Sequence, residues 1–181
     1  MKSRFATLYT TSVLPELKKR FGYKNVNAAP RVEKVVINIG VGRLARDEKV
    51  AEHIRKNLEL ISGQRPVIRK ARKSIASFKL REGMTVGMMV TLRGKRMYDF
   101  LDKLVNVILP RIRDFRGLTP TSIDQRGNFS LGLQEQGIFP EIGSENLEPQ
   151  HGLQVTVQTT AKSYDEGLAL LQLLGFPFIK E

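Results

Sequence analysis

The segment from residue 84 to residue 93 limits the possible folds more than any other part of the sequence. Apolar residues occupy every second position (Met84, Val86, Met88, Val90 and Leu92) and alternate with Thr85, Gly87, Met89, Thr91 and Arg93. Successive side chains of a strand point to opposite faces, so this pattern predicts a strand with one apolar and one mostly polar face. Such a strand is typical of a sheet that packs on one side and leaves the other side open.

The remaining periodicities predict the partners of this strand. Strands are expected over residues 31–40, 66–70, 128–134 and 153–158, and helices over 4–21, 47–62 and 95–109. Pro15 should kink the first helix or begin a second turn system in it. A last helix is expected to open at the capping box of Ser163 and Glu166 and to end at Gly175. Residues 71–83 have no clear period and are predicted to form a long, mobile, basic loop between two strands.

This element order predicts an α+β fold. It contains the split βαβ order of an RRM-like or ferredoxin-like core, which gives a mixed, mostly antiparallel five-stranded sheet with helices on one face. The sequence has no internal repeat, no low-complexity tract and no linker long enough to divide it. We therefore expect residues 1–181 to form a single domain.

The charge is unevenly distributed along the chain. The 181 residues include 30 Lys and Arg against 18 Asp and Glu, a formal charge of +12. Residues 1–119 carry 27 basic and 10 acidic side chains, whereas residues 120–181 carry 3 basic and 8 acidic ones. Residues 60–81 contain seven Lys and Arg and no acid. The first two thirds therefore suit a polyanion, and the acidic last third suits a different partner.

The open face of the predicted sheet narrows the class of polyanion. By alternation it carries Lys34, Val36 and Asn38 from one strand and Thr85, Gly87, Met89, Thr91 and Arg93 from another, and its strands contribute no aromatic side chain. Proteins that read single-stranded RNA usually stack bases on aromatic rings, so we expect structured RNA that is contacted through its backbone and groove edges. The polar pattern of these strands, taken alone, is equally well explained by side chains that simply face solvent.

The residues give little support to enzymatic, metal or membrane functions. The chain has no Cys, and His53 and His151 show no metal-ligand spacing, so both are predicted to be surface histidines. The most apolar stretch, residues 84–92, is far shorter than the roughly 20 residues of a membrane span. We expect no enzymatic activity, no cofactor, no membrane association and a cytosolic location.

Two alternatives stay open at this stage. Residues 40–45 read G-x-G-x-x-A after a predicted strand, a pattern that is also found in dinucleotide sites. Arg69 and Lys70 at the end of the next strand could hold a 2′-phosphate. An NADP-binding enzyme is therefore one alternative. A regulatory RNA- or DNA-binding module is the other.

Several long strings point to one family. They are residues 33–38 (EKVVIN), 60–66 (LISGQRP), 69–75 (RKARKSI), 78–84 (FKLREGM), 110–117 (PRIRDFRG), 127–132 (GNFSLG), 139–142 (FPEI) and 174–178 (LGFPF). In this order they closely resemble the bacterial or organellar type of large-subunit ribosomal protein number five, the 5S rRNA-binding family. The resemblance covers nearly the whole chain, and residues 143–152 match it poorly.

The resemblance implies a structural protein that attaches 5S rRNA in the central protuberance of the large ribosomal subunit. By matching positions, the 5S rRNA would be held by Lys34, Asn38, Gln64, Thr91 and Arg93. The basic loop would reach the tRNA in the peptidyl site through Arg72, Lys73, Ser74, Ser77, Lys79 and Arg81. The surface after Pro110, including residues 134–142, would form an intersubunit bridge with small-subunit ribosomal protein number thirteen. Further implied partners are 23S rRNA and other proteins of the central protuberance.

Overall fold

The structure is a computed structural model that describes residues 3–42, 48–143 and 150–179. Its residues group into two compact units. The first unit comprises Met1–Val35, Leu92–Leu131 and Thr156–Glu181, and the second comprises Val36–Thr91 and Gly132–Val155. Each unit is described separately below. Asp47 and residues 43–45 of the G-x-G-x-x-A string lie outside the described residues.

The strands form one five-stranded sheet in the order β2-β3-β1-β5-β4. Their bounds are Val32–Gly40 (β1), Val67–Lys70 (β2), Thr85–Leu92 (β3), Phe129–Leu133 (β4) and Leu153–Thr159 (β5). Helix α3 (Glu48–Ser62) connects β1 to β2, and β3 lies between these two strands. This is the predicted split βαβ arrangement, and the α+β prediction is confirmed. The dinucleotide interpretation is wrong, because that motif requires β1 and β2 to be direct neighbours.

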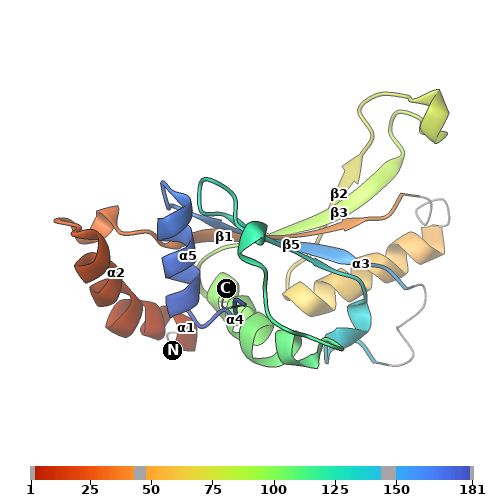
Figure 1. The fold of residues 1–181 in the computed structure, drawn as a ribbon. Helices are drawn as coiled ribbons and strands as arrows, with labels where there is room; N and C mark the ends of the chain where they lie inside the picture. Colours follow the sequence, from red (N-terminus) through yellow and green to blue (C-terminus); the bar gives the residue numbers. More distant parts are fainter. Residues whose placement is uncertain (1–2, 43–47, 144–149, 180–181) are drawn as a thin grey trace. The chain divides into compact units, whose positions relative to one another are not determined.

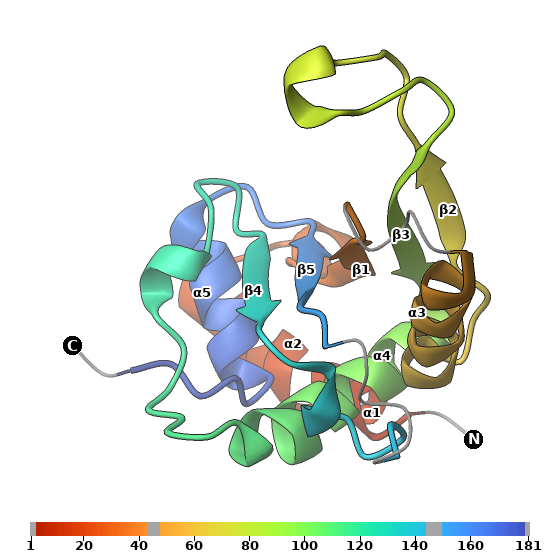
Figure 2. The ribbon, with the colours of Figure 1, turned by 90° about the vertical axis from the view of Figure 1, so that its right-hand side faces the viewer.

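The second unit has its core between α3 and the strands (Figure 2). Ile37 and Ile39 of β1 and Met88 and Val90 of β3 are buried, as are Ile54, Leu58 and Ile61 of α3. These residues follow the predicted periods of two in the strands and of about 3.6 in the helix. The alternate positions of β1 and β3 therefore form a face that the helix does not cover.

Two helical segments of the first unit each contain a π-helical turn shortly before a proline. Helix α1 (Arg4–Leu8) continues through a π-helical turn (Tyr9–Val13) into α2 (Leu14–Phe21), and α4 (Gly94–Lys103) continues through a second one (Leu104–Ile108) into a 3-10 turn (Leu109–Arg111). Each π-helical turn ends two residues before a proline, Pro15 or Pro110. Proline lacks an N–H donor and its ring clashes with the carbonyl four residues earlier, and the wider turn relieves that clash. The predicted helices are thus present, and Pro110 lies inside the final turn.

The last helix, α5 (Tyr164–Leu173), begins at the predicted capping box. Ser163 Oγ accepts a hydrogen bond from the Glu166 N–H at 3.4 Å, and Glu166 Oε2 accepts one from the Lys162 N–H at 2.8 Å. The other carboxylate oxygen of Glu166 accepts a hydrogen bond from the Tyr23 hydroxyl at 2.5 Å. Burial, and then this bond, raise the pKa of Tyr23 above its ordinary value. The cap therefore also ties α5 to the segment that follows α2.

Two glycines fix α5 against the turn before β4. A Cβ on Gly167 would lie 2.6 Å from the Gly127 carbonyl oxygen, and Gly127 has a φ of +75°. The Gly127 carbonyl accepts a hydrogen bond from the Thr159 hydroxyl at 2.9 Å, which holds that turn in place. Further 3-10 turns lie at Val26–Ala28, Ala76–Phe78, Pro120–Ser122 and Gln136–Ile138.

Candidate nucleic-acid interface

Three of the predicted RNA-binding residues lie in the second unit on side chains that point away from its core. Asn38 is exposed between the buried Ile37 and Ile39, and its side chain makes no hydrogen bond to another described residue. Thr91 is half-buried between Val90 and Leu92. Gln64, just after α3, donates from Nε2 to the Thr91 carbonyl at 3.3 Å. The structure thus brings Gln64 and Thr91 together, and their Oε1 and Oγ1 atoms make no hydrogen bond to another described residue.

The other two predicted residues, Lys34 and Arg93, belong to the first unit. Arg93 is exposed at the end of β3, and its Nη1 lies 3.6 Å from Oε1 of Glu33. Both side chains of this ion pair are about half exposed. Exposed pairs of this kind contribute little to stability, so Arg93 can exchange the carboxylate for a phosphate at low cost.

The uncovered face of the second unit is less polar than the strand pattern indicates. Val67 of β2 is 56% exposed and is the register partner of Met89 on β3, which is half-buried. Arg69, one of the four exposed residues of β2, donates from Nε to the Met89 sulfur at 2.9 Å. The sequence does not indicate this contact, because it depends on the pairing of β2 with β3, which periodicity does not reveal. The register pairs Arg69 with Gly87 on the same face.

The basic loop extends the β2–β3 hairpin beyond the strands and away from α3 (Figures 1 and 2). Backbone hydrogen bonds continue along it, from Ala71 N to Met84 O at 2.8 Å and in both directions between Ile75 and Leu80. Lys79 at the tip adopts a left-handed conformation with a φ of 50°. The predicted loop residues Arg72, Lys73, Ser74, Ser77, Lys79 and Arg81 are all exposed.

Two side chains of the loop have roles that the sequence did not indicate. Ser74 Oγ accepts a hydrogen bond from the Glu82 N–H at 2.9 Å, so Ser74 holds the two arms of the loop together. Phe78 at the tip is 76% exposed, the highest value among the large apolar residues that the structure describes. The exposed ring of Phe78 is a candidate contact residue at the loop tip.

The acidic third contains a buried histidine. His151 is only 5% exposed, its backbone N–H donates to Oε1 of the buried Gln136 at 2.8 Å, and neither ring nitrogen has a partner among the described residues. The prediction of a surface histidine is therefore wrong, because Gly152 lets the chain pack directly on the backbone at Leu133. Burial lowers the pKa of the His151 imidazole, and repulsion from His53 lowers it further, while the nearby Gly152 backbone opposes this effect.

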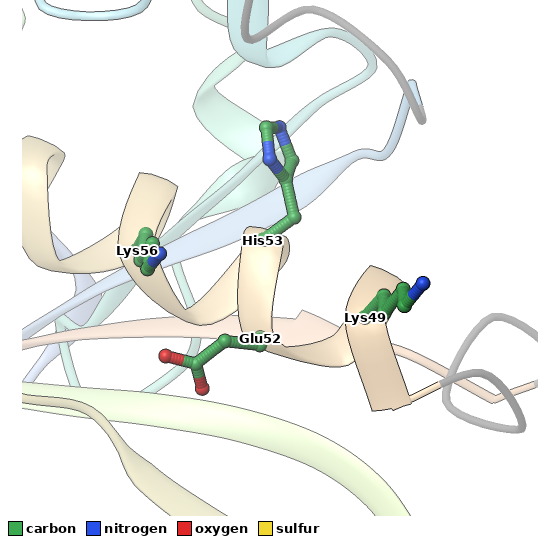
Figure 3. A pocket seen from close by; sticks show the side chains of 4 residues that line it. All are labelled: Lys49, Glu52, His53 and Lys56. Atoms are coloured by element: carbon green, nitrogen blue, oxygen red, sulfur yellow. The ribbon is translucent and has the colours of Figure 1, made fainter.

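A hollow of about 400 Å³ beside α3 is a candidate for a small-molecule site. It is lined by Lys49, Glu52, His53 and Lys56, which lie on successive turns of the same helix. Figure 3 shows that Glu52 and His53 point in different directions, so they do not form an acid–base pair. Glu52 is instead held by Arg55 at 2.5 Å. We therefore interpret this hollow as part of the charged surface of α3.

The described residues contain no metal site and no membrane-spanning helix. Within residues 3–42, 48–143 and 150–179, no cluster of three or more His, Asp or Glu side chains could hold a metal ion. No helix in these ranges is long and apolar enough to cross a membrane. The exposed polar and basic side chains around β1, β2 and β3 are thus the best candidate site.

Comparisons with known proteins show which family the chain belongs to. The sequence pattern of the family described as "Ribosomal protein L5" matches residues 25–81, and the pattern for the C-terminus of the same ribosomal family matches residues 85–178. Proteins named "Large ribosomal subunit protein uL5" from Thermoanaerobacter sp. (strain X514) and Synechocystis sp. (strain ATCC 27184 / PCC 6803 / Kazusa) are 52% and 51% identical over 178 residues. Each comparison covers 98% of this chain and 99% of the relative. A protein of the same name from Colwellia psychrerythraea is 52% identical over 174 residues, covering 96% of both chains. The chain therefore belongs to the bacterial L5 family of large-subunit ribosomal proteins, which work with rRNA in the cytoplasmic ribosome as structural components and not as enzymes.

Proposed function

We propose that this chain binds 5S rRNA and attaches it in the central protuberance of the large subunit. The observation that carries the proposal is the contrast between the two faces of β1. Ile37 and Ile39 are fully buried, whereas the Asn38 side chain between them is exposed and has no hydrogen-bond partner among the described residues. A rigid strand thus presents an unused amide to solvent. An amide both donates and accepts, which suits the 2′-hydroxyl and base edges of structured RNA.

Gln64 and Thr91 supply further groups of the same kind in the second unit. The bond from Gln64 Nε2 to the Thr91 carbonyl orients the Gln64 amide, so its Oε1 is positioned to accept a hydrogen bond. The Thr91 hydroxyl both donates and accepts. Such contacts fix the register and orientation of a protein on RNA, and they add little of the salt-dependent attraction.

That attraction would come from the basic side chains. In the first unit, Arg93 and Lys34 would neutralise phosphates, with Arg93 released from its exposed pair with Glu33. Each phosphate contact to RNA steepens the dependence of log affinity on log salt by roughly 0.7 to 0.9. Binding should therefore weaken strongly as the salt concentration rises. Contacts of the same type would connect the protein to 23S rRNA.

The basic loop would contact the tRNA in the peptidyl site. Its cations, Arg72, Lys73, Lys79 and Arg81, are all exposed at the end of an extended hairpin that also presents Ser77. The hairpin bonds between Ile75 and Leu80 limit the conformations of the tip, so less ordering is needed when the tip binds. Phe78 would add a stacking surface for a base or ribose.

The acidic third would serve as a protein contact. In this account the surface after Pro110, with residues 134–142, forms an intersubunit bridge with small-subunit ribosomal protein number thirteen. Glu135 and Glu141 are exposed there, beside the buried Gln136 and Phe139. Exposed carboxylates on a packed segment favour a basic protein over RNA.

Competition binding tests the central proposal. Labelled 5S rRNA would be bound at physiological salt and displaced either by unlabelled 5S rRNA or by an unrelated structured RNA of equal length. We expect the unrelated RNA to compete at least tenfold less well. Equal competition would refute the proposal and would favour a general RNA-binding module.

A further inference from the structure

The uncovered face of the second unit carries a planar cation that none of the proposed contacts uses. The register pairs Arg69 with Gly87 and Val67 with Met89, so these four residues share one face of the β2–β3 hairpin. A Cβ on Gly87 would lie 4.0 Å from Oδ1 of Asn38, which places Asn38 on the same face. Arg69 is therefore a neighbour of the proposed RNA-binding residues.

The contact between Arg69 and Met89 fixes the guanidinium group without covering it. Nε of Arg69 donates to the Met89 sulfur at 2.9 Å. A bond from Nε lies in the plane of the guanidinium, so it restricts the rotation of that plane and leaves its flat surfaces unblocked. Arg69 nevertheless remains exposed. A long cationic side chain is thus oriented in advance on an open surface.

Gly87 and Val67 shape the surroundings of this group. Gly87 has no side chain opposite Arg69, and a Cβ there would come within 3.1 Å of the Ile39 carbonyl. Nothing on β3 therefore pushes the arginine away from the sheet at this position. Val67, which pairs with Met89, adds an apolar surface that is 56% exposed.

We propose that Arg69, Met89 and Val67 form a stacking platform for an unpaired base of the bound RNA. A flat cation beside apolar atoms matches the face of a nucleobase, which is planar, apolar and electron-rich. The platform replaces the aromatic rings that these strands lack. It adds a looped or bulged nucleotide to the backbone and groove contacts of Asn38, Gln64 and Thr91. The inference rests on the proposed function of this face.

The experiment compares Arg69→Lys with the wild-type protein. Lysine keeps the charge and loses the plane, whereas Arg126→Lys in the turn before β4 serves as a control of the same chemistry. The probes are 5S rRNAs that each carry 2-aminopurine at one unpaired position, because the fluorescence of this base reports its stacking. Thermal unfolding of each variant checks that the fold is kept.

We expect the wild-type protein to change the fluorescence at one unpaired position and Arg69→Lys to lose this change. Affinity for 5S rRNA should fall about three- to fivefold, as expected for an exposed cation–π contact, with an unchanged salt dependence. Met89→Leu should lose part of the effect, and Arg126→Lys should lose none.

Two outcomes would overturn the platform while leaving 5S rRNA binding intact. One is an Arg69→Lys variant that binds as well as wild type with the same fluorescence at every position. The other is an Arg69→Ala variant that lowers the salt dependence by one contact while Arg69→Lys behaves as wild type, which would make Arg69 a phosphate contact. A wild-type protein that does not prefer 5S rRNA would instead refute the proposed function, and the platform with it.

Discussion

Removing the Asn38 side chain should separate RNA binding from stability. In Asn38→Ala, the lost groups are exposed and have no hydrogen-bond partner among the described residues, so the free energy of unfolding should change by less than about 0.5 kcal/mol. RNA binding should lose one or two hydrogen bonds. At about 1 kcal/mol each, this corresponds to a weakening of roughly five- to thirtyfold.

The neighbouring Ile37 provides the matched control. It lies on the same strand with its side chain fully buried, so Ile37→Ala should lower the free energy of unfolding by about 2–5 kcal/mol. Filter binding to 5S rRNA and urea unfolding of the same samples would measure both quantities. The proposed role of Asn38 in RNA binding is refuted if Asn38→Ala binds 5S rRNA like the wild type, or if it destabilises the protein as much as Ile37→Ala does.

Three further predictions test separate parts of the structure. Gly167→Ala would place a Cβ 2.6 Å from the Gly127 carbonyl oxygen, so thermal unfolding should reveal a destabilisation of about 3 kcal/mol or more. A change below about 1 kcal/mol would contradict this packing. Phe78→Ala should leave thermal unfolding unchanged, because the ring is exposed, and should weaken tRNA binding in a gel-shift titration; equal binding by the variant would exclude a contact. The pKa of His151 in the folded protein lies below its ordinary value of 6.5, so the unfolded chain takes up a proton first as the pH falls. The free energy of unfolding should therefore decrease from about pH 6.5 downward, until the folded protein is protonated as well. His151→Gln should show a smaller drop in calorimetric scans between about pH 7.5 and pH 5.5, and an equal drop would assign the effect to other groups.

The fold could be predicted from the sequence wherever one face of an element is buried. The alternation around Met88 and Val90 in β3, and the helical spacing of Ile54 and Leu58 in α3, correspond to residues that are buried in the structure. Burial imposes these periods, so they can be read without knowing the partner strand. The capping box at Ser163 was predictable for a similar reason, because its hydrogen bonds are local.

Features that depend on long-range contacts could not be predicted in this way. The acidic segment around His151 predicts a surface position, but its burial depends on the bond to Gln136 and on the close approach of Gly152 to the Leu133 backbone. The bond from Arg69 to Met89 depends on the register of β2 with β3. Both π-helical turns precede a proline, yet the prolines alone do not distinguish a kink from a wider turn.

The residue pattern alone indicates only part of the candidate site, and the family resemblance implies the remaining residues. Alternation placed Asn38 and Thr91 on an open face, but those positions equally fit solvent-facing strand residues. Gln64 follows a helix and carries no periodic signal, and only the structure shows its bond to Thr91. The exposure of the Phe78 ring likewise depends on the hydrogen bonds that shape the loop tip.

A ribonuclease footprint of the protein on 5S rRNA tests the central claim most directly. We expect one compact protected region at physiological salt, with weaker protection when Asn38→Ala or Thr91→Val replaces the wild-type protein at the same concentration. Buried-face variants that still fold should protect the same nucleotides. Protection scattered over the whole RNA, or an unchanged footprint with both open-face variants, would contradict the claim that this face binds 5S rRNA.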